Sequence, residues 1–225
     1  MSTAPYCEHS LCIWFCEDQR GIDIMPIRFA GVEDSRACLQ IYSQYIDTPI
    51  TFEYTLPDVS AFSDRIRQVT AIYPWLVYEE NGQIWGYTYA HRQMEREAYQ
   101  WNAELTVYLD QRYTSRGIGK QLYSVLLTLL KHMGIQTVYA GVTLPNEKSV
   151  GLHKSLGFRM TGIYYRTGYK CGKWHDVAWF EKALSVGYPT PQPILPLPEA
   201  DPEKLKMFLR GQAVSSDGLW KKADD

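Results

Sequence analysis

The stretch that decides the fold is Glu104-Leu-Thr-Val-Tyr-Leu-Asp-Gln-Arg-Tyr-Thr-Ser-Arg-Gly-Ile-Gly-Lys120. It begins as a strand, continues through a polar loop and enters a helix whose first turn contains Gly117 and Gly119. The first N–H groups of a helix have no internal partner and carry the positive end of the helix dipole. Glycine lets a pyrophosphate approach them closely, so the segment predicts a phosphate site. Three basic residues add positive charge there: Arg112, Arg116 and Lys120. An ordinary helix start with a glycine turn remains the alternative.

Two common nucleotide-binding loops do not fit this turn. A Walker loop requires glycine where Thr114 stands, and a serine or threonine where Gln121 follows Lys120. A dinucleotide fingerprint requires a third glycine where Leu122 stands. The segment is therefore neither a Walker loop nor a dinucleotide-binding loop.

The periodicity of apolar residues around this stretch predicts alternating strands and helices. Asn81-Gly82 favours a tight hairpin turn between two of the strands. The resulting order, β-α-α-β-β-β-α-β-α-β-β, belongs to the α/β (α+β) class. Strands are predicted at 26–30, 75–78, 84–90, 101–109, 137–142, 159–165 and 174–181, and helices at 34–45, 58–70, 117–133 and 148–156.

Composition divides the chain into three parts. Residues 1–24 show no periodicity and form an N-terminal extension, and residues 25–184 form one compact domain. Residues 185–225 begin with a proline-rich linker. Asp201 and Pro202 then start a short helix whose Leu205, Phe208 and Leu209 form one apolar stripe. That stripe must dock on its own body or on a second subunit.

Charge and cysteine content exclude several classes of protein. The net charge is −2, which lacks the basic field of a nucleic-acid-binding protein, so we expect no nucleic-acid partner. The apolar run 11–16 is too short to span a bilayer, so we expect no membrane association. Five scattered cysteines indicate a reducing compartment, the cytoplasm. A zinc cluster of Cys7, His9, Cys12 and Cys16 lacks a second pair of ligands, and we expect no metal.

Further motifs give the glycine turn a context. The turn reads Thr114-Ser-Arg-Gly-Ile-Gly119 and is followed by Asn146-x-x-Ser149-x-x-Leu152-His153-x-x-Leu156-Gly-Phe158. Together with the preceding strand, these residues resemble the GNAT acyl-CoA N-acyltransferase superfamily. Three more stretches, at 73–77, 98–108 and 172–177, are similar to the phosphinothricin and methionine sulfoximine N-acetyltransferases within it. The resemblance spans about 26–184. The family carries glutamine or arginine where Thr114 stands, so this chain lacks that side chain but keeps the backbone N–H donor.

This resemblance implies a GNAT fold, with a mixed, mostly antiparallel central sheet of about six or seven strands flanked by about four helices. It also implies acetyl-CoA as cosubstrate. The pantetheine arm would pair with the backbone of a strand that splays from its neighbour, and the pyrophosphate would lie on the glycine turn. The implied contacts are Val107, Tyr108, Leu109, Arg112, Ser115, Arg116, Gly117, Ile118, Gly119, Lys120, Asn146 and Ser149. Asn146 is equally a plausible helix N-cap.

Glu104 is the predicted general base. A protonated amine cannot attack a thioester, so a group must remove its proton, and partial burial of a lone glutamate raises its pKa toward a useful range. The family's proposed base matches this position. A structural pair with Arg92 or Arg96 is the alternative. His153 stands where many GNAT enzymes carry a tyrosine acid for the leaving thiolate, although it could simply be a packing residue.

The acceptor side rests on fewer residues. Arg96 matches the family's substrate segment and would pair with a carboxylate, unless it is an ordinary surface arginine. Phe52, Tyr99 and Thr106 would line the pocket. Ser43 replaces an asparagine that relatives often carry, which leaves the choice of substrate open.

The sequence therefore predicts an enzyme that transfers acetyl from acetyl-CoA directly to the amine of a small, amino-acid-like substrate of the phosphinothricin or methionine sulfoximine type. A protein or peptide N-terminal acetyltransferase is one alternative, and a non-catalytic acyl-CoA sensor is another. The high aromatic content indicates surface that is buried between subunits, and the resembled family is commonly dimeric. We therefore expect a homodimer.

Overall fold

The computed structural model describes residues 16–17, 23–24, 26–185 and 190–209. Its centre is a sheet in the order β3-β4-β5-β6-β7-β9-β8. All neighbouring strands are antiparallel except β6 and β7, which are parallel. This confirms the predicted mixed, mostly antiparallel sheet. The strands are β3 (Ile27–Phe29), β4 (Trp75–Glu80), β5 (Gln83–Arg92), β6 (Asn102–Leu109), β7 (Thr137–Thr143), β8 (Arg159–Lys170) and β9 (Lys173–Ala183).

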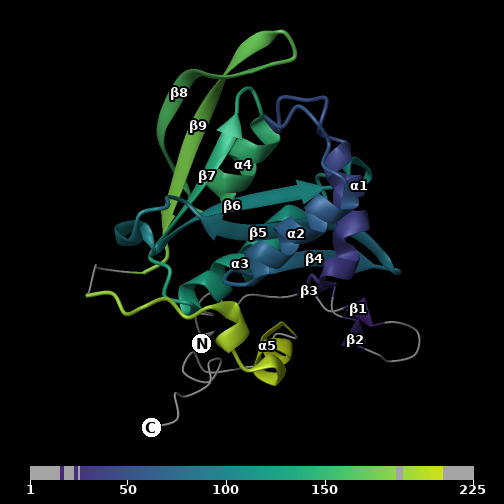
Figure 1. Ribbon diagram of the computed structural model, residues 1–225, viewed down its shortest axis with the longest axis vertical. Coiled ribbons are helices and arrows are strands. Elements are labelled where there is room, and N and C mark those ends of the chain that lie inside the picture. The colour runs from purple at the N-terminus through teal and green to yellow at the C-terminus, as the bar shows by residue number, and fades with distance from the viewer. Residues whose placement is uncertain (1–15, 18–22, 25, 186–189, 210–225) are drawn as a thin grey trace, which may run out of the picture.

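Helices cover both faces of this sheet (Figure 1). Helices α1 (Ser35–Ser43) and α2 (Val59–Thr70) pack on one face, where Cys38, Tyr42, Phe62 and Ile66 meet Trp75 in one apolar cluster. Helices α3 (Ile118–His132) and α4 (Glu147–Ser155) lie on the other face. Leucines of α3 meet Leu76 and Leu105 there, so alternate residues of β4 face opposite clusters.

The predicted start and stop signals act where expected. The Asp58 carboxylate accepts a hydrogen bond from the Ala61 N–H at 2.8 Å and caps α2. Asn81 and Gly82 both have positive φ, as a tight turn between β4 and β5 requires. Strands β8 and β9 form a hairpin that is longer than the sequence predicted. Its added residues, up to Lys170, are mostly exposed and carry no clear alternation of polarity.

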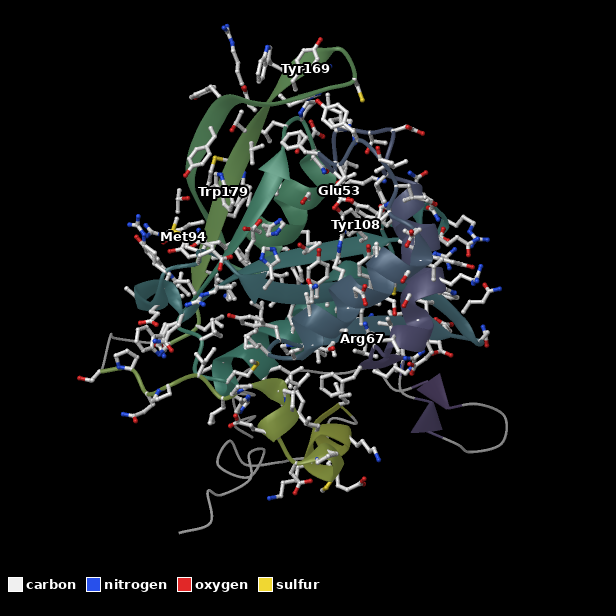
Figure 2. All side chains as sticks on the ribbon, viewed as in Figure 1. Glu53, Arg67, Met94, Tyr108, Tyr169 and Trp179 are labelled. Atoms are coloured by element: carbon white, nitrogen blue, oxygen red, sulfur yellow. The ribbon has the colours of Figure 1, made fainter. Side chains whose placement is uncertain are left out.

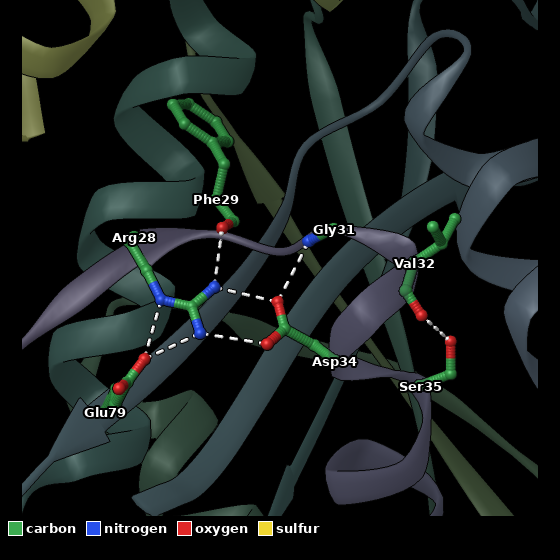
Figure 3. Close-up of polar contacts among 7 residues, drawn as sticks. All are labelled: Arg28, Phe29, Gly31, Val32, Asp34, Ser35 and Glu79. Carbon is green, nitrogen blue, oxygen red and sulfur yellow. Dashed lines mark hydrogen bonds and ion pairs between the residues drawn. The ribbon is translucent and has the colours of Figure 1, made fainter. Parts of the chain in front are cut away.

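A charged cluster anchors the start of α1 to the sheet edge (Figure 3). Arg28 on β3 donates hydrogen bonds to both carboxylate oxygens of Asp34, at 2.7 and 2.9 Å, and to Glu79 on β4 at 2.7 Å. Asp34 also accepts from the Gly31 N–H at 2.9 Å. Burial opposes ionisation of Asp34, yet its hydrogen bonds with Arg28 and Gly31 hold the pKa below its ordinary value.

The C-terminal segment docks on the same body. The Trp101 Nε1–H donates to the Gln192 carbonyl at 2.7 Å, and the Leu197 N–H donates to the Ile72 carbonyl at 2.9 Å. In α5 (Pro202–Leu209), Leu205 and Leu209 are buried in the main core. The apolar stripe therefore has an intramolecular partner, and the compact body continues past the boundary expected near Leu184.

The extremes of the chain add little to the site. Within the predicted N-terminal extension, Cys16–Glu17 (β1) pairs with Asp23–Ile24 (β2). Strands of two residues are too short to be recognised from periodicity.

The helices in the described part of the chain include none with the length and apolar character needed to span a membrane. The described residues contain no group of three histidines, cysteines or acids placed to hold a metal. Cys7, His9 and Cys12 lie outside the described residues.

Candidate active site

The site begins where β6 and β7 separate. These parallel strands pair only from Asn102 to Glu104 on β6 and from Thr137 to Tyr139 on β7. Beyond Glu104 each strand continues without pairing to the other, β6 to Leu109 and β7 to Thr143. A cavity of about 420 Å³ opens in this gap. The separation is the splay that the resemblance implied, and it leaves backbone groups available to a ligand.

Glu104 lies at the point of separation and lines this central cavity with Thr106 and Tyr108 of the same strand. Burial raises the pKa of the Glu104 carboxyl above its ordinary value, and the charge of His91, its cross-strand neighbour on β5, partly opposes that shift. Neither Arg92 nor Arg96 perturbs this carboxyl in the described part of the chain. The alternative, a structural ion pair with either arginine, is therefore not formed among the described residues, and Glu104 lines the cavity.

A second cavity, of about 720 Å³, continues from the first. The two share Ile50, Val107, Tyr108, Asn146 and Ser149 in their walls, so they form one groove. The second cavity runs between the end of β6, the start of α3 and α4. Of the predicted cofactor residues, it is lined by Val107, Tyr108, Leu109, Ser115, Gly117, Gly119, Lys120, Asn146 and Ser149.

The start of α3 presents free N–H groups to this groove. The first hydrogen bond of the helix runs from the Gln121 N–H to the Gly117 carbonyl at 3.1 Å, so the N–H groups of residues 118–120 have no helical acceptor. Gly117 has φ +82°, a conformation that glycine adopts without cost, and a Cβ there would meet no atom within 4 Å. Gly117 is also one of the residues that line the second cavity. This geometry suits a diphosphate.

Three predicted cofactor residues turn their side chains elsewhere. Arg112 donates hydrogen bonds to Asp110 at 2.8 and 3.0 Å, and Arg116 lies over the rings of Tyr113 and Trp85 at 5.2 and 5.9 Å. Ile118 is buried in the core. None of the three lines either cavity of the groove.

Asn146, Ser149 and His153 follow one another on α4. The Asn146 side chain accepts from the Ser149 N–H at 3.1 Å, so it is the N-cap and a groove residue at once. The His153 Nδ1–H donates to the Ser149 carbonyl at 2.7 Å, and His153 is 2% exposed. Burial lowers its pKa, so the ring is neutral near pH 7. Its Nε2 has no partner among the described residues.

Two of the four residues predicted to bind the acceptor lie in the groove and two do not. Phe52 and Thr106 line the central cavity, whereas Arg96 and Tyr99 line neither cavity of the groove. Both belong to the loop between β5 and β6, where Tyr99 ends the short 3-10 helix η2 (Glu97–Tyr99) and Arg96 directly precedes it. In Figure 2, Met94 in that loop lies well away from Tyr108 and Glu53. Their role in binding the acceptor stays a prediction.

The sequence analysis missed part of the cavity wall. Tyr123 on α3, Tyr164 on β8 and Trp179 on β9 all line it. Tyr123 is 1% exposed, and its ring centre lies 5.5 Å from that of His153. Residues four apart share a helix face, so Tyr123 follows Gly119 along the side that meets the groove. That spacing is the signal that could have identified it.

Comparison with known proteins agrees with this architecture. Residues 27–179 match the family described as Acetyltransferase (GNAT) domain. The chain is 35% identical to the phosphinothricin N-acetyltransferase of Streptomyces viridochromogenes, over 80% of this chain and 97% of that protein. It is 29% identical to the L-methionine sulfoximine/L-methionine sulfone acetyltransferase of Salmonella typhimurium, over 71% of this chain and 95% of that protein.

Solved structures give the same result. A GNAT superfamily phosphinothricin acetyltransferase from Sinorhizobium meliloti, crystallised with acetyl-CoA, superposes with a TM-score of 0.71. The two chains are 31% identical, over 74% of this chain and 92% of that one.

Proposed function

The chain belongs to the GNAT acetyltransferase family, and on this premise we propose that it transfers acetyl from acetyl-CoA to the primary amine of a small amino-acid-like acceptor, with Glu104 as the general base. The observation that carries the proposal is the position of Glu104. It stands where β6 leaves β7, inside the cavity that continues into the groove at the start of α3.

The groove supports acetyl-CoA as the donor. Unpaired N–H groups at the start of α3 attract the diphosphate, and Lys120 on the same turn adds a positive charge. The separated strand β6 offers backbone groups to the extended pantetheine arm. Together these contacts bring the thioester to the end of the gap that Glu104 occupies.

Glu104 then supports the proton transfer. A carboxyl whose pKa is raised by burial is a better proton acceptor near neutral pH than an exposed one. It takes the proton from the acceptor's ammonium group, and the freed electron pair attacks the thioester carbonyl carbon. The nitrogen gives up a second proton as the carbon–sulfur bond breaks, so that an amide forms and the departing thiolate takes up that proton as the free thiol of coenzyme A. No covalent bond to the enzyme is needed.

His153 as the acid that protonates the thiolate stays a prediction. Because its pKa is lowered and its Nδ1–H is given to the Ser149 carbonyl, its Nε2 carries no proton near pH 7. A proton reaching the thiolate from His153 must therefore first be delivered to Nε2. Replacing His153 with asparagine tests whether the ring takes part in that step.

The acceptor class is inferred from the relatives' names and from the size of the central cavity. The relatives are named for phosphinothricin and for methionine sulfoximine or sulfone. A cavity of about 420 Å³ accommodates molecules of that size. Its aromatic walls, Phe52, Tyr164 and Trp179, suit the carbon skeleton of the acceptor.

The cellular setting and assembly complete the proposal. The described thiols Cys38 and Cys171 are unpaired, which supports a reducing compartment, the cytoplasm. Exposed aromatic residues on the β8–β9 hairpin, such as Tyr165 at 73% and Trp174 at 59%, support a homodimer. Light scattering after size-exclusion chromatography tests the dimer.

The activity is tested by following thiol release from acetyl-CoA across a panel of free amino acids, phosphinothricin and methionine sulfoximine. We expect turnover with a subset of these amines, and a loss of about 10²- to 10⁴-fold in kcat for Glu104→Gln. Binding of acetyl-CoA without turnover on the whole panel would contradict an enzymatic role. Full activity of Glu104→Gln would contradict only the assignment of the base.

A further inference from the structure

The loop between α1 and α2 contacts the tip of the β8–β9 hairpin, far away in the sequence. Lys170 is 5% exposed, and its ammonium group donates hydrogen bonds to the carbonyls of Thr51 at 2.7 Å and Glu53 at 2.8 Å. Tyr54 donates a hydrogen bond to the Tyr169 carbonyl. Figure 1 shows this loop beside the end of the hairpin. These contacts join two segments that both line the central cavity.

The two carbonyls that Lys170 binds lie on either side of Phe52. A cation that holds residues 51 and 53 by their backbone fixes the direction in which the side chain between them points. The Phe52 ring lines the central cavity, and its centre lies 6.4 Å from that of His175. No ion pair in the described residues uses Lys170, so its buried charge is matched by backbone carbonyls.

Gly168 provides the space for that ring. A Cβ built on Gly168 would overlap the far edge of the Phe52 ring. By contrast, a Cβ on Gly162 of the same strand would meet no atom within 4 Å. Neither glycine has a positive φ, so alanine at either position carries no backbone strain. The glycine at 168 is therefore needed for close packing against Phe52.

Other contacts hold the rest of the loop. The hydroxyls of Tyr42 and Thr51 are hydrogen-bonded at 2.6 Å, and Arg65 donates to Glu53 at 2.7 Å. The loop is thus fixed on α1, on α2 and on the hairpin. The hairpin contacts bear on Phe52 from both sides: Lys170 binds the carbonyls of its two neighbours, and Gly168 packs against its ring.

We propose that Lys170 and Gly168 are positioning residues for the acceptor amine: together they hold Phe52 as a wall of the acceptor cavity. The proposal rests on the acetyltransferase function proposed above. It predicts a specific kinetic signature, because the second cavity, which takes acetyl-CoA, is lined by neither these residues nor Phe52. Loosening Phe52 raises KM for the acceptor and leaves KM for acetyl-CoA unchanged.

The test is a cycle of variants assayed with methionine sulfoximine, or with the best acceptor of the panel. Gly168→Ala is expected to raise the acceptor KM about tenfold, with KM for acetyl-CoA within about twofold of wild type. The matched control Gly162→Ala is expected to behave as wild type. In a Phe52→Ala background, Gly168→Ala is expected to have almost no further effect, because the ring it displaces is gone.

Lys170→Met, which keeps the length of the side chain and removes the hydrogen bonds, gives an independent arm. It is expected to raise the acceptor KM, whereas Lys173→Met, an exposed residue of the same hairpin, is not. If Lys170→Met does not fold, the glycine cycle still decides. An equal effect of Gly168→Ala with and without Phe52 would overturn the proposal, as would an equal rise in KM for acetyl-CoA. Absence of turnover in the wild type would instead refute the proposed function.

Discussion

Replacing Gly117 with alanine separates the binding role of the glycine turn from its structural role. Gly117 precedes α3 with φ +82° and lines the cofactor groove. Gly82, in the turn between β4 and β5, is a matched control, since it has φ +72° and, like Gly117, space for a Cβ. Gly82 does not line the groove. The two substitutions should therefore have the same structural cost and different effects on the cofactor.

The magnitudes follow from the backbone. A left-handed conformation costs alanine about 1–2 kcal/mol, so each variant is expected to lose about that much free energy of unfolding. Neither suffers a clash, because no atom lies within 4 Å of either Cβ. At Gly117 the added methyl group projects into the groove and keeps a diphosphate from the helix N–H groups. Losing one charged hydrogen bond of about 1.5–3 kcal/mol weakens acetyl-CoA binding roughly 10- to 100-fold.

Urea unfolding measures the first quantity, and titration calorimetry with acetyl-CoA measures the second. Similar losses of stability are expected in both variants, together with weak cofactor binding in Gly117→Ala alone. If Gly117→Ala binds acetyl-CoA as tightly as Gly82→Ala does, the diphosphate does not lie on this turn. The assignment of the groove would then have to be abandoned.

Three other expectations concern stability. Glu104 has a folded pKa raised above its value of 4.5 in an unfolded chain, so the wild type loses stability as pH rises from about 4.5 through the raised pKa. Glu104→Gln should gain stability relative to wild type over that range in urea unfolding, and a pH-independent difference would contradict burial of the charge. Asp34→Asn should lose about 1–3 kcal/mol of free energy of unfolding at pH 7. The loss should shrink as pH falls from about 3.8 through the lowered pKa of the folded protein, where the wild-type carboxyl becomes protonated too. An unchanged melting temperature at pH 7 would show that the Arg28 cluster contributes nothing. Leu209→Ala should lose about 2–5 kcal/mol, whereas Met207→Ala on the exposed side of α5 should change little, and equal losses would mean that α5 does not dock as described.

Much of the fold was predictable because its signals are local. The Asn81-Gly82 turn, the Asp58 cap and the glycine start of α3 each depend on a few neighbouring residues, and the apolar stripe of α3 depends on helical spacing. The divergence of β6 from β7 was not visible in the residues themselves. It came from the resemblance to the family.

Features that depend on distant contacts were not predictable. Arg112 pairs with Asp110, so its charge is held away from the phosphate site where the sequence analysis predicted it. Arg96 and Tyr99 lie in an irregular loop whose path no periodicity specifies. Lys170 reads as an ordinary hairpin lysine until the fold brings it to Thr51, 119 positions away. Burial of a cation depends on the tertiary structure alone.

The gap in the sheet also bears on how the protein avoids aggregation. Unpaired strand backbone at the border of a sheet is a template for a strand of another molecule. Here the unpaired lengths of β6 and β7 face each other within one sheet, and α3 and α4 cover one face beside them. A slender substrate can enter such a slot more easily than a second polypeptide with its side chains. The fold thus keeps exposed backbone for binding without offering it to other chains.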